Sequence, residues 1–139
     1  MATYDFYAAG PFFNESQIAS MSRMEQVLES NGKVVFKPRF ASDITVVGPS
    51  GCFHDDVNGI RNSRAVIANL IDEDSGTMFE IGYAYAQGIP VYAYCEGLKP
   101  GDKVNLMIAQ SVSAVFSSAE ELDRFLKTGQ YDAIELSQF

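Results

Sequence analysis

The fold is decided by residues 65–94, which read AVIANLIDEDSGTMFEIGYAYAQGIPVYAY. The first six are almost entirely apolar, which is typical of a strand buried on both faces of a sheet. Residues 77–87 predict a helix, which Gly88 and Pro90 end. Residues 90–94 then predict another strand. A strand, a helix and a strand in this order form a unit in which the two strands run parallel.

A helix nearer the N-terminus has a well-marked start. Asn14 is a good N-cap residue, and Gln17 follows three positions later, as in a capping box. Apolar residues at helical spacing then predict the buried stripe of this helix: Ile18, Met21, Val27 and Leu28. Gly32 predicts its end, because glycine adopts the left-handed conformation that closes many helices.

The alternation of strands and helices continues along the rest of the chain. The other predicted strands lie at residues 4–8, 33–36 and 113–116. The other predicted helices lie at residues 55–63, at residues 105–110 and after Ser118, which forms a capping box with Glu121. Residues 37–51 hold two prolines and two glycines and predict a long loop, a feature that is more often functional than idle.

This pattern predicts an α/β fold, a flavodoxin-like three-layer sandwich with a five-stranded, mostly parallel sheet. We expect the strand order 2-1-3-4-5 and a single domain over residues 1–139, since no linker or repeat interrupts the chain. In such sheets ligands bind at the carboxyl ends of the strands, where the strand order reverses. The site is therefore expected after the first and third strands.

Composition restricts the classes of partner. The net charge of −8 argues against nucleic acid, whose phosphates are bound by clustered Lys and Arg. No apolar run approaches the roughly 20 residues of a membrane span, and no basic and apolar leader is visible, so we expect a cytoplasmic protein. Cys52 and Cys95 lie far apart, in no metal-ligand spacing, and we expect free thiols and no metal site.

The loops after the first and third strands carry the candidate chemistry. Residues 7–13 offer a phenol, a glycine and aromatic rings, and Asp72, Asp74 and Glu80 follow the third strand. Glu80 is expected in the first turn of its helix, where backbone N–H groups keep a carboxylate nucleophile ionised. An aspartate crowded by other carboxylates would have a raised pKa and could act as an acid.

Two carboxyl groups with divided roles are what glycosyl transfer with retention requires. A simpler interpretation remains open at this point, because acidic residues in a first helical turn also stabilise the helix alone. An acidic run such as residues 72–74 is also common as a solvated turn.

Four segments, taken in order and spacing, are similar to those of one known family. They are residues 6–13 (FYAAGPFF), 56–60 (DVNGI), 74–84 (DSGTMFEIGYA) and 105–107 (NLM). In these segments the chain resembles the nucleoside 2-deoxyribosyltransferases, from the first strand to about residue 116. The resemblance implies an enzyme that transfers a 2-deoxyribosyl group from a 2′-deoxynucleoside to a free purine or pyrimidine base, without a metal or organic cofactor.

The resemblance also implies roles for individual residues. Glu80 would form the covalent deoxyribosyl intermediate, and Tyr7 would orient it. Asp74 would contact the nucleobase, and Asp56 would share in base recognition and proton transfer. Asn105 would bind the sugar 5′-hydroxyl from a neighbouring subunit, which implies a homo-oligomer with shared active sites.

Further substrate-binding residues are expected on the same segments: Gly10, Phe12, Phe13, Asp72 and Met107. The chain departs from the family pattern in two places. Residues 37–51 contain no clear counterpart of the family's base-contacting Gln, for which Arg39 and Ser42 are candidates. The C-terminus ends in Phe139 without a terminal Tyr.

Two other classes of protein share features with this sequence. An N-glycoside hydrolase of 2′-deoxynucleosides or their 5′-monophosphates would use related chemistry. For a monophosphate it would need Ser, Arg or N–H groups to hold the phosphate. A phospho-accepting receiver domain shares the strand order but needs an acidic pair after the first strand, where this chain has Ala8, Ala9 and Gly10.

Overall fold

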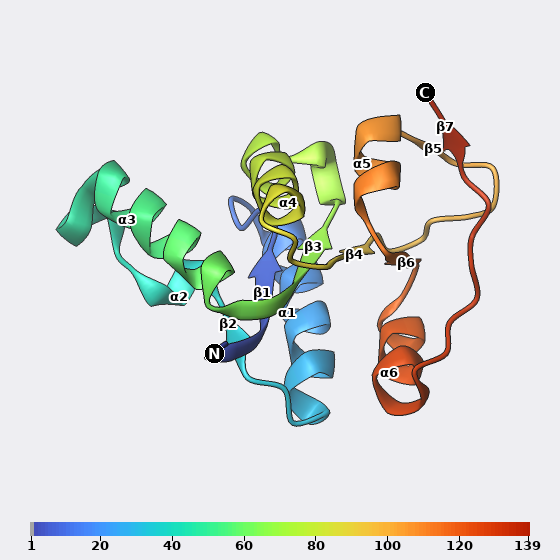
Figure 1. The fold of residues 1–139 in the computed structure, drawn as a ribbon, viewed down its shortest axis with the longest axis horizontal. Coiled ribbons are helices and arrows are strands. Elements are labelled where there is room, and N and C mark those ends of the chain that lie inside the picture. The colour runs from blue at the N-terminus through green and yellow to red at the C-terminus, as the bar shows by residue number, and fades with distance from the viewer. Residues whose placement is uncertain (1) are drawn as a thin grey trace.

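Five parallel strands form the central sheet, in the order β2-β1-β3-β4-β6. The computed structural model describes residues 2–139 (Figure 1). The strands are β1 (Tyr4–Ala9), β2 (Val35–Phe36), β3 (Ser63–Asn69), β4 (Val91–Tyr94) and β6 (Ala114–Phe116). The predicted order 2-1-3-4-5 is confirmed, with β6 as the fifth strand of the sheet.

Helices cover both faces of this sheet, as Figure 1 shows. One face carries α1 (Glu15–Ser30) and α6 (Ala119–Thr128). The other carries α3 (Ile44–Arg61), α4 (Ser75–Ala86) and α5 (Leu106–Ser111). The predicted three-layer α/β sandwich is therefore confirmed. None of the helices in residues 2–139 is both long enough and apolar enough to cross a membrane.

The middle of each central strand is apolar because it supplies side chains to two cores, whereas Asp5 and Arg64 lie near the strand starts. In β1, Phe6 and Ala8 face α1 and α6, whereas Tyr7 and Ala9 face α3 and α4. Alternate residues of β3 divide in the same way, with Ile67 in the first core and Val66 in the second. The position of Tyr7 on the α3–α4 side places its hydroxyl toward the candidate site.

The expected start of α1 is confirmed, but its buried stripe differs from the prediction. Asn14 accepts a hydrogen bond from the Gln17 backbone N–H over 2.9 Å and caps the helix. Ile18, expected in the core, is 43% exposed, whereas Met24, which was not predicted, is fully buried. Met24 lies three residues after Met21 and four before Leu28, so the three share the face that packs on the sheet.

The long loop predicted at residues 37–51 is wrong. This segment forms the short helix α2 (Pro38–Ala41) and the first part of α3, which begins at Ile44 and not near residue 55. Asp43 caps α3 by accepting from the Thr45 N–H over 2.8 Å. Gly48 has a left-handed φ of 73° and breaks the helix, and Pro49 restarts it. Proline suits a helix start because the first N–H groups lack helical partners.

A second element was not predicted. Two short strands, β5 (Lys103–Val104) and β7 (Ser137–Gln138), pair in parallel outside the main sheet. The pairing continues into α5, where the Leu106 N–H donates to the Phe139 carbonyl over 2.8 Å. The end of the chain is thereby held beside the start of α5.

The revised stripe of α1 can be tested by two substitutions on one helix. Met24→Ala should lower the free energy of unfolding by about 2–5 kcal/mol, because it leaves a cavity in the core. Ile18→Ala, at an exposed position, should cost less than about 1 kcal/mol. Urea unfolding followed by circular dichroism measures both values. Equal losses for the two variants would contradict the burial described for this face.

Candidate active site

The centre of the site is a buried contact between β1 and α4. Tyr7 is fully buried, and its hydroxyl donates a hydrogen bond to Oε2 of Glu80. The Tyr7 ring stacks on Phe36, with ring centroids 5.3 Å apart. This packing fixes the phenol, and the phenol in turn fixes one oxygen of the Glu80 carboxylate.

Glu80 does not lie in the first turn of its helix, as was expected. The helix α4 begins at Ser75, two residues earlier than predicted, so Glu80 falls in the second turn. The N-cap is Asp74, whose Oδ2 accepts hydrogen bonds from both the N–H and the hydroxyl of Thr77 over 2.9 Å. Helix N–H groups therefore stabilise the charge of Asp74 directly, and that of Glu80 far less.

Burial, opposed by the Tyr7 hydrogen bond, governs the protonation of Glu80. The pKa of Glu80 is raised to about 7 in all: loss of hydration raises it most, the hydrogen bond from Tyr7 lowers it, and the charges of Asp56 and Asp74 raise it. Burial and the neighbouring Glu80 raise the pKa of Tyr7 well above its usual value, so its hydroxyl stays protonated and remains a donor.

Asp56 faces the same pocket from α3. Burial first, and the charge of Asp55 second, raise the pKa of Asp56 to about 6. Its Oδ1 is buried and has no hydrogen-bond partner among the described residues. At pH 7 a carboxyl group with a pKa of about 6 still carries a proton about one tenth of the time. The group with the raised pKa thus lies on α3 and not in the acidic loop after β3, and burial, more than crowding by other carboxylates, raises its pKa.

Most of the predicted site residues lie together. A pocket of about 240 Å³ at the carboxyl ends of β1 and β3 is lined by Gly10, Phe12, Phe13, Asp56, Asp74 and Glu80, with further apolar residues. At Gly10 a Cβ atom would lie 2.3 Å from Sδ of Met21, so only glycine lets the loop pass this closely over α1. The reversal of strand order thus places the pocket where the sequence predicted it.

The pocket continues into a wider groove of about 710 Å³, which shares Phe12, Phe13, Pro38 and Asp56 with it. The two candidates for base contact, Arg39 and Ser42, line this groove. Arg39 also forms a nearly buried ion pair with Glu25 over 2.7 Å, which ties α2 to α1.

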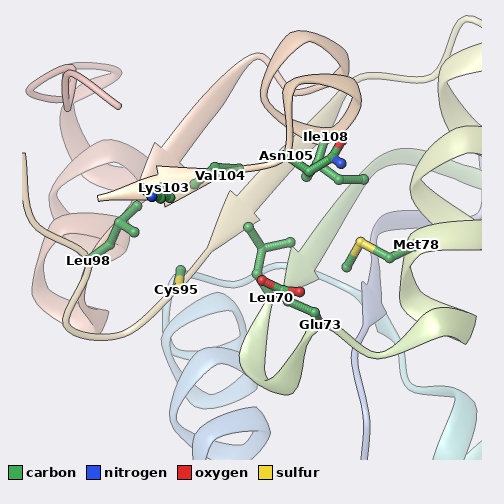
Figure 2. Close-up of a pocket in the computed structure, with 9 residues that line it drawn as sticks. All are labelled: Leu70, Glu73, Met78, Cys95, Leu98, Lys103, Val104, Asn105 and Ile108. Atoms are coloured by element: carbon green, nitrogen blue, oxygen red, sulfur yellow. The ribbon is translucent and has the colours of Figure 1, made fainter. Parts of the chain in front are cut away.

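Three predicted site residues lie outside the pocket. Asp72 accepts a hydrogen bond from the Gln17 side chain over 2.9 Å and lines neither the pocket nor the groove. Asn105 lines a separate cavity of about 370 Å³, shown in Figure 2, together with Met78. Met107 lies on a hollow between α4 and α5 and is 71% exposed.

The helix α4 separates the cavity of Figure 2 from the pocket that Glu80 lines. Met78 and Glu80 are two residues apart, so their side chains leave the helix in widely different directions. Asn105 has a local role in this chain, because its Oδ1 accepts from the Met107 N–H over 2.8 Å and caps α5. Within one chain, Asn105 and Met107 do not line the pocket of Glu80.

Several pocket residues were missed by sequence reasoning. Phe53 and Phe79 also line the pocket, and their ring centroids are 5.9 Å apart. Phe53, Asp56, Val57 and Ile60 form one face of α3 at helical spacing. That spacing would have predicted Phe53, had the helix been recognised upstream of residue 55.

Among residues 2–139, no three His, Cys, Asp or Glu side chains gather closely enough to hold a metal ion.

The fold and the pocket together define a class, an α/β enzyme whose facing carboxyl groups suit the cleavage of a glycosidic bond. The family model described as nucleoside 2-deoxyribosyltransferase matches residues 6–107. The chain therefore belongs to the nucleoside 2-deoxyribosyltransferase family and is an enzyme of this type. No curated protein sequence matches it.

Solved structures agree with this assignment. A 2-deoxyribosyltransferase from Bacillus psychrosaccharolyticus is 30% identical, with a TM-score of 0.72 over 94% of this chain and 96% of that one. A 2-desoxiribosyltransferase from Leishmania mexicana shares the fold at 23% identity, with a TM-score of 0.67 over 90% and 98% of the two chains. A CMP N-glycosidase from Clostridium botulinum shares it at 19% identity, with a TM-score of 0.60 over 88% and 98%.

The raised pKa of Glu80 predicts a pH-dependent stability. The unfolded chain releases this proton near the ordinary pKa of 4.5, whereas the folded chain keeps it until about 7. Stability is therefore lost as the pH rises through this window. Glu80→Gln, which stays neutral at all pH values, should gain roughly 2 kcal/mol more over the wild type at pH 8 than at pH 5.

Chemical denaturation of both proteins at the two pH values measures this difference. An equal effect of Glu80→Gln at pH 5 and pH 8 would show that burial does not shift the titration of this carboxyl group.

Proposed function

We propose that the protein transfers the 2-deoxyribosyl group between nucleobases through a covalent intermediate on Glu80, with retention of configuration. The observation that carries this proposal is the Glu80 carboxylate at the pocket wall, with Oε2 held by Tyr7. Exchange of bases in this way is a reaction of deoxyribonucleoside salvage.

The reaction has two displacements at the anomeric carbon. In the first, a Glu80 oxygen attacks C1′, the bond from C1′ to the base nitrogen breaks, and the base leaves with its bonding electrons. In the second, a nitrogen of the incoming base attacks C1′ and releases the carboxylate. Each displacement inverts C1′, so the product keeps the original configuration.

Tyr7 supports both steps. Its hydroxyl holds Oε2, which leaves Oε1 to attack, and its hydrogen bond favours the ionised form that a nucleophile needs. Because its own pKa is raised, Tyr7 does not lose the proton that it donates. When the ester forms through Oε1 of Glu80, the same hydroxyl can remain hydrogen-bonded to Oε2, which is then the carbonyl oxygen of the ester.

The two aspartates take different parts. Asp56, with a pKa of about 6, supplies a proton to the departing base and recovers one from the incoming base. Asp74 uses Oδ2 to cap α4, which leaves Oδ1 for a polar group of the base. The aromatic rings of Phe12, Phe13, Phe53 and Phe79 supply apolar surface around these polar groups, and exclusion of water from the intermediate favours transfer over hydrolysis.

The second candidate function is hydrolysis of 2′-deoxynucleosides or of their 5′-monophosphates. The fold that this chain shares with a CMP N-glycosidase is the reason to consider it. A phosphate would need cationic or N–H donors near the sugar. The residues lining the pocket include two Asp and one Glu, but no Lys or Arg. This charge disfavours a phosphate at the sugar and favours a free 5′-hydroxyl.

We also propose that the active enzyme is at least a dimer with shared sites. The surface of α4 and α5 exposes apolar side chains that an interface would bury, namely Tyr85, Leu106 and Met107 at 62%, 45% and 71% exposure. Asn105 begins α5 in this surface, and its amide N–H₂ has no acceptor among the described side chains. A neighbour's Asn105 would donate to the sugar 5′-hydroxyl, and Met107 would close the pocket.

The transfer reaction is tested by incubating the protein with deoxyinosine and free adenine. Chromatography should show deoxyadenosine in the β-configuration. Glu80→Ala should lose more than about three orders of magnitude of this activity, whereas Glu120→Gln, at an exposed position on α6, should keep it. A 2-fluoro-arabinosyl nucleoside should leave a mass adduct on the peptide that contains Glu80, since fluorine slows turnover of the intermediate.

Release of hypoxanthine without deoxyadenosine would instead identify a hydrolase. Preference for the 5′-monophosphate would overturn the free-hydroxyl assignment, and an adduct on another residue would remove Glu80 from its role.

The shared-site arrangement predicts complementation. Asn105→Asp keeps the cap of α5, because aspartate is an equally good N-cap, but it removes the N–H₂ donor. Inactive Glu80→Ala and inactive Asn105→Asp, mixed under subunit exchange, should recover activity, because each hybrid dimer contains one intact site. Absence of recovery although mass spectrometry shows hybrids, or an active monomer in sedimentation, would contradict shared sites.

A further inference from the structure

The turn between β3 and α4 is strained. Asp72 and Glu73, which lie in the 3₁₀ segment Ile71–Glu73, both have left-handed φ angles, of 58° and 48°. For residues other than glycine this conformation is unfavourable and persists only where the surroundings impose it. The turn is therefore held by contacts outside itself.

Two buried polar side chains of α1 supply those contacts. Gln17, 7% exposed, donates from Nε2 to Oδ2 of Asp72 over 2.9 Å. Ser20, 2% exposed, accepts from Nδ2 of Asn69 over 2.9 Å, and Oδ1 of Asn69 accepts from the Ile71 N–H over 3.0 Å. Gln17 and Ser20 are one helical turn apart, so a single face of α1 holds both ends of the strained turn.

Gln17 makes a second hydrogen bond, through its side-chain oxygen. Its Oε1 accepts from the backbone N–H of Phe13 over 2.8 Å. Phe13 belongs to the loop after β1 that lines the pocket, whereas Asp72 belongs to the loop after β3. One side-chain amide therefore connects the two loops that meet where the strand order reverses.

The strained turn leads directly into the catalytic helix. Asp74 follows Glu73, lines the pocket and caps α4 through Thr77, and α4 carries Glu80. A shift of the turn would move Asp74 and the start of α4 relative to the aromatic loop. Contact with the substrate is not needed for such an effect.

We propose that Gln17 is a positioning residue, which holds the Phe12–Phe13 loop and the Asp72–Asp74 turn in the relative position that catalysis requires. In this arrangement Asp72 is the hydrogen-bond acceptor of Gln17 and not a substrate ligand. For its kinetic test this inference rests on the proposed transfer of deoxyribosyl groups. Its structural test depends on the contacts alone.

The two hydrogen bonds of Gln17, to Phe13 and to Asp72, form a bridge between the two loops. Substitutions can break this bridge and rebuild it with donor and acceptor exchanged between positions 17 and 72. In Gln17→Glu, the new carboxylate still accepts from the Phe13 N–H but repels Asp72, so kcat for base exchange should fall at least about tenfold. Asp72→Asn keeps an acceptor for Gln17 and should stay within about twofold of the wild type. In the double variant Gln17→Glu/Asp72→Asn, the Asn amide donates to the Glu carboxylate, and kcat should return to within about threefold.

Hydrogen–deuterium exchange tests the same bridge without any activity. Amides of residues 12–14 and 70–77 should exchange faster together in Gln17→Glu and regain protection in the double variant. Gln26→Glu, an exposed glutamine on the same helix, should change neither exchange nor kcat. Gln17→Met, of the same length but without the amide, should reproduce the loss if Gln17→Glu does not fold.

Three results would overturn the inference: a double variant no better than Gln17→Glu, faster exchange in only one of the two loops, or a large loss of kcat in Asp72→Asn alone. The last would make Asp72 a direct substrate ligand. A wild-type protein without base exchange would refute the proposed function, and the exchange pattern would still decide the bridge.

Discussion

The hydrogen bond from Tyr7 to Glu80 is the contact on which the rest of the site depends. It joins residues 73 positions apart, one on the central strand β1 and one on α4. Glu80 is half-buried, and a carboxylate that loses hydration is costly unless a donor compensates for the loss. Tyr7 supplies that donor and is itself fixed between the sheet and Phe36. The sheet order, the stacking of Tyr7 and the packing of α4 must all be right for this bond to form, so the fold as a whole determines the reactivity of one side chain.

The acidity of the site follows from the same constraint. Three carboxyl groups line a small pocket, and the charges of Asp56 and Asp74 raise the pKa of Glu80. The helix N-terminus does little for Glu80, because Glu80 lies in the second turn and the Thr77 N–H donates to Asp74. Stability is thus lost as the pH rises from about 4.5 to about 7, and the site retains a nucleophile with little water around it. This is the usual relation between stability and activity at a functional site. The pH at which Glu80 ionises, near 7, lies within the range in which Asp56 can still carry a proton.

Residues that do not line the pocket contribute to the site in two ways. Within the chain, one face of α1 holds the strained turn before α4 through Gln17 and Ser20, so buried polar residues of a structural helix determine where Asp74 lies. Outside the pocket, Asn105 and Met107 lie beyond α4 on an apolar surface. A second copy of the chain would bring these residues to the open side of the pocket, and this would join assembly to catalysis.

The sequence alone determined the alternation of elements, the strand order, the cap at Asn14 and the segments that carry Glu80, Asp74 and Asp56, because these follow from local patterns and from spacing along the chain. It misplaced the start of α3, because a helix broken at Gly48 has two short patterns in place of one long one. It also put Glu80 in the first turn of its helix, where the structure has it in the second, and it gave no sign that Asp72 accepts a hydrogen bond from Gln17. Only the tertiary structure decided those points, since the burial of Glu80, its bond to Tyr7 and the bond from Gln17 to Asp72 join segments between 55 and 73 residues apart. Contacts at that separation leave no periodic trace in the sequence, because they depend on how the sheet and its helices pack.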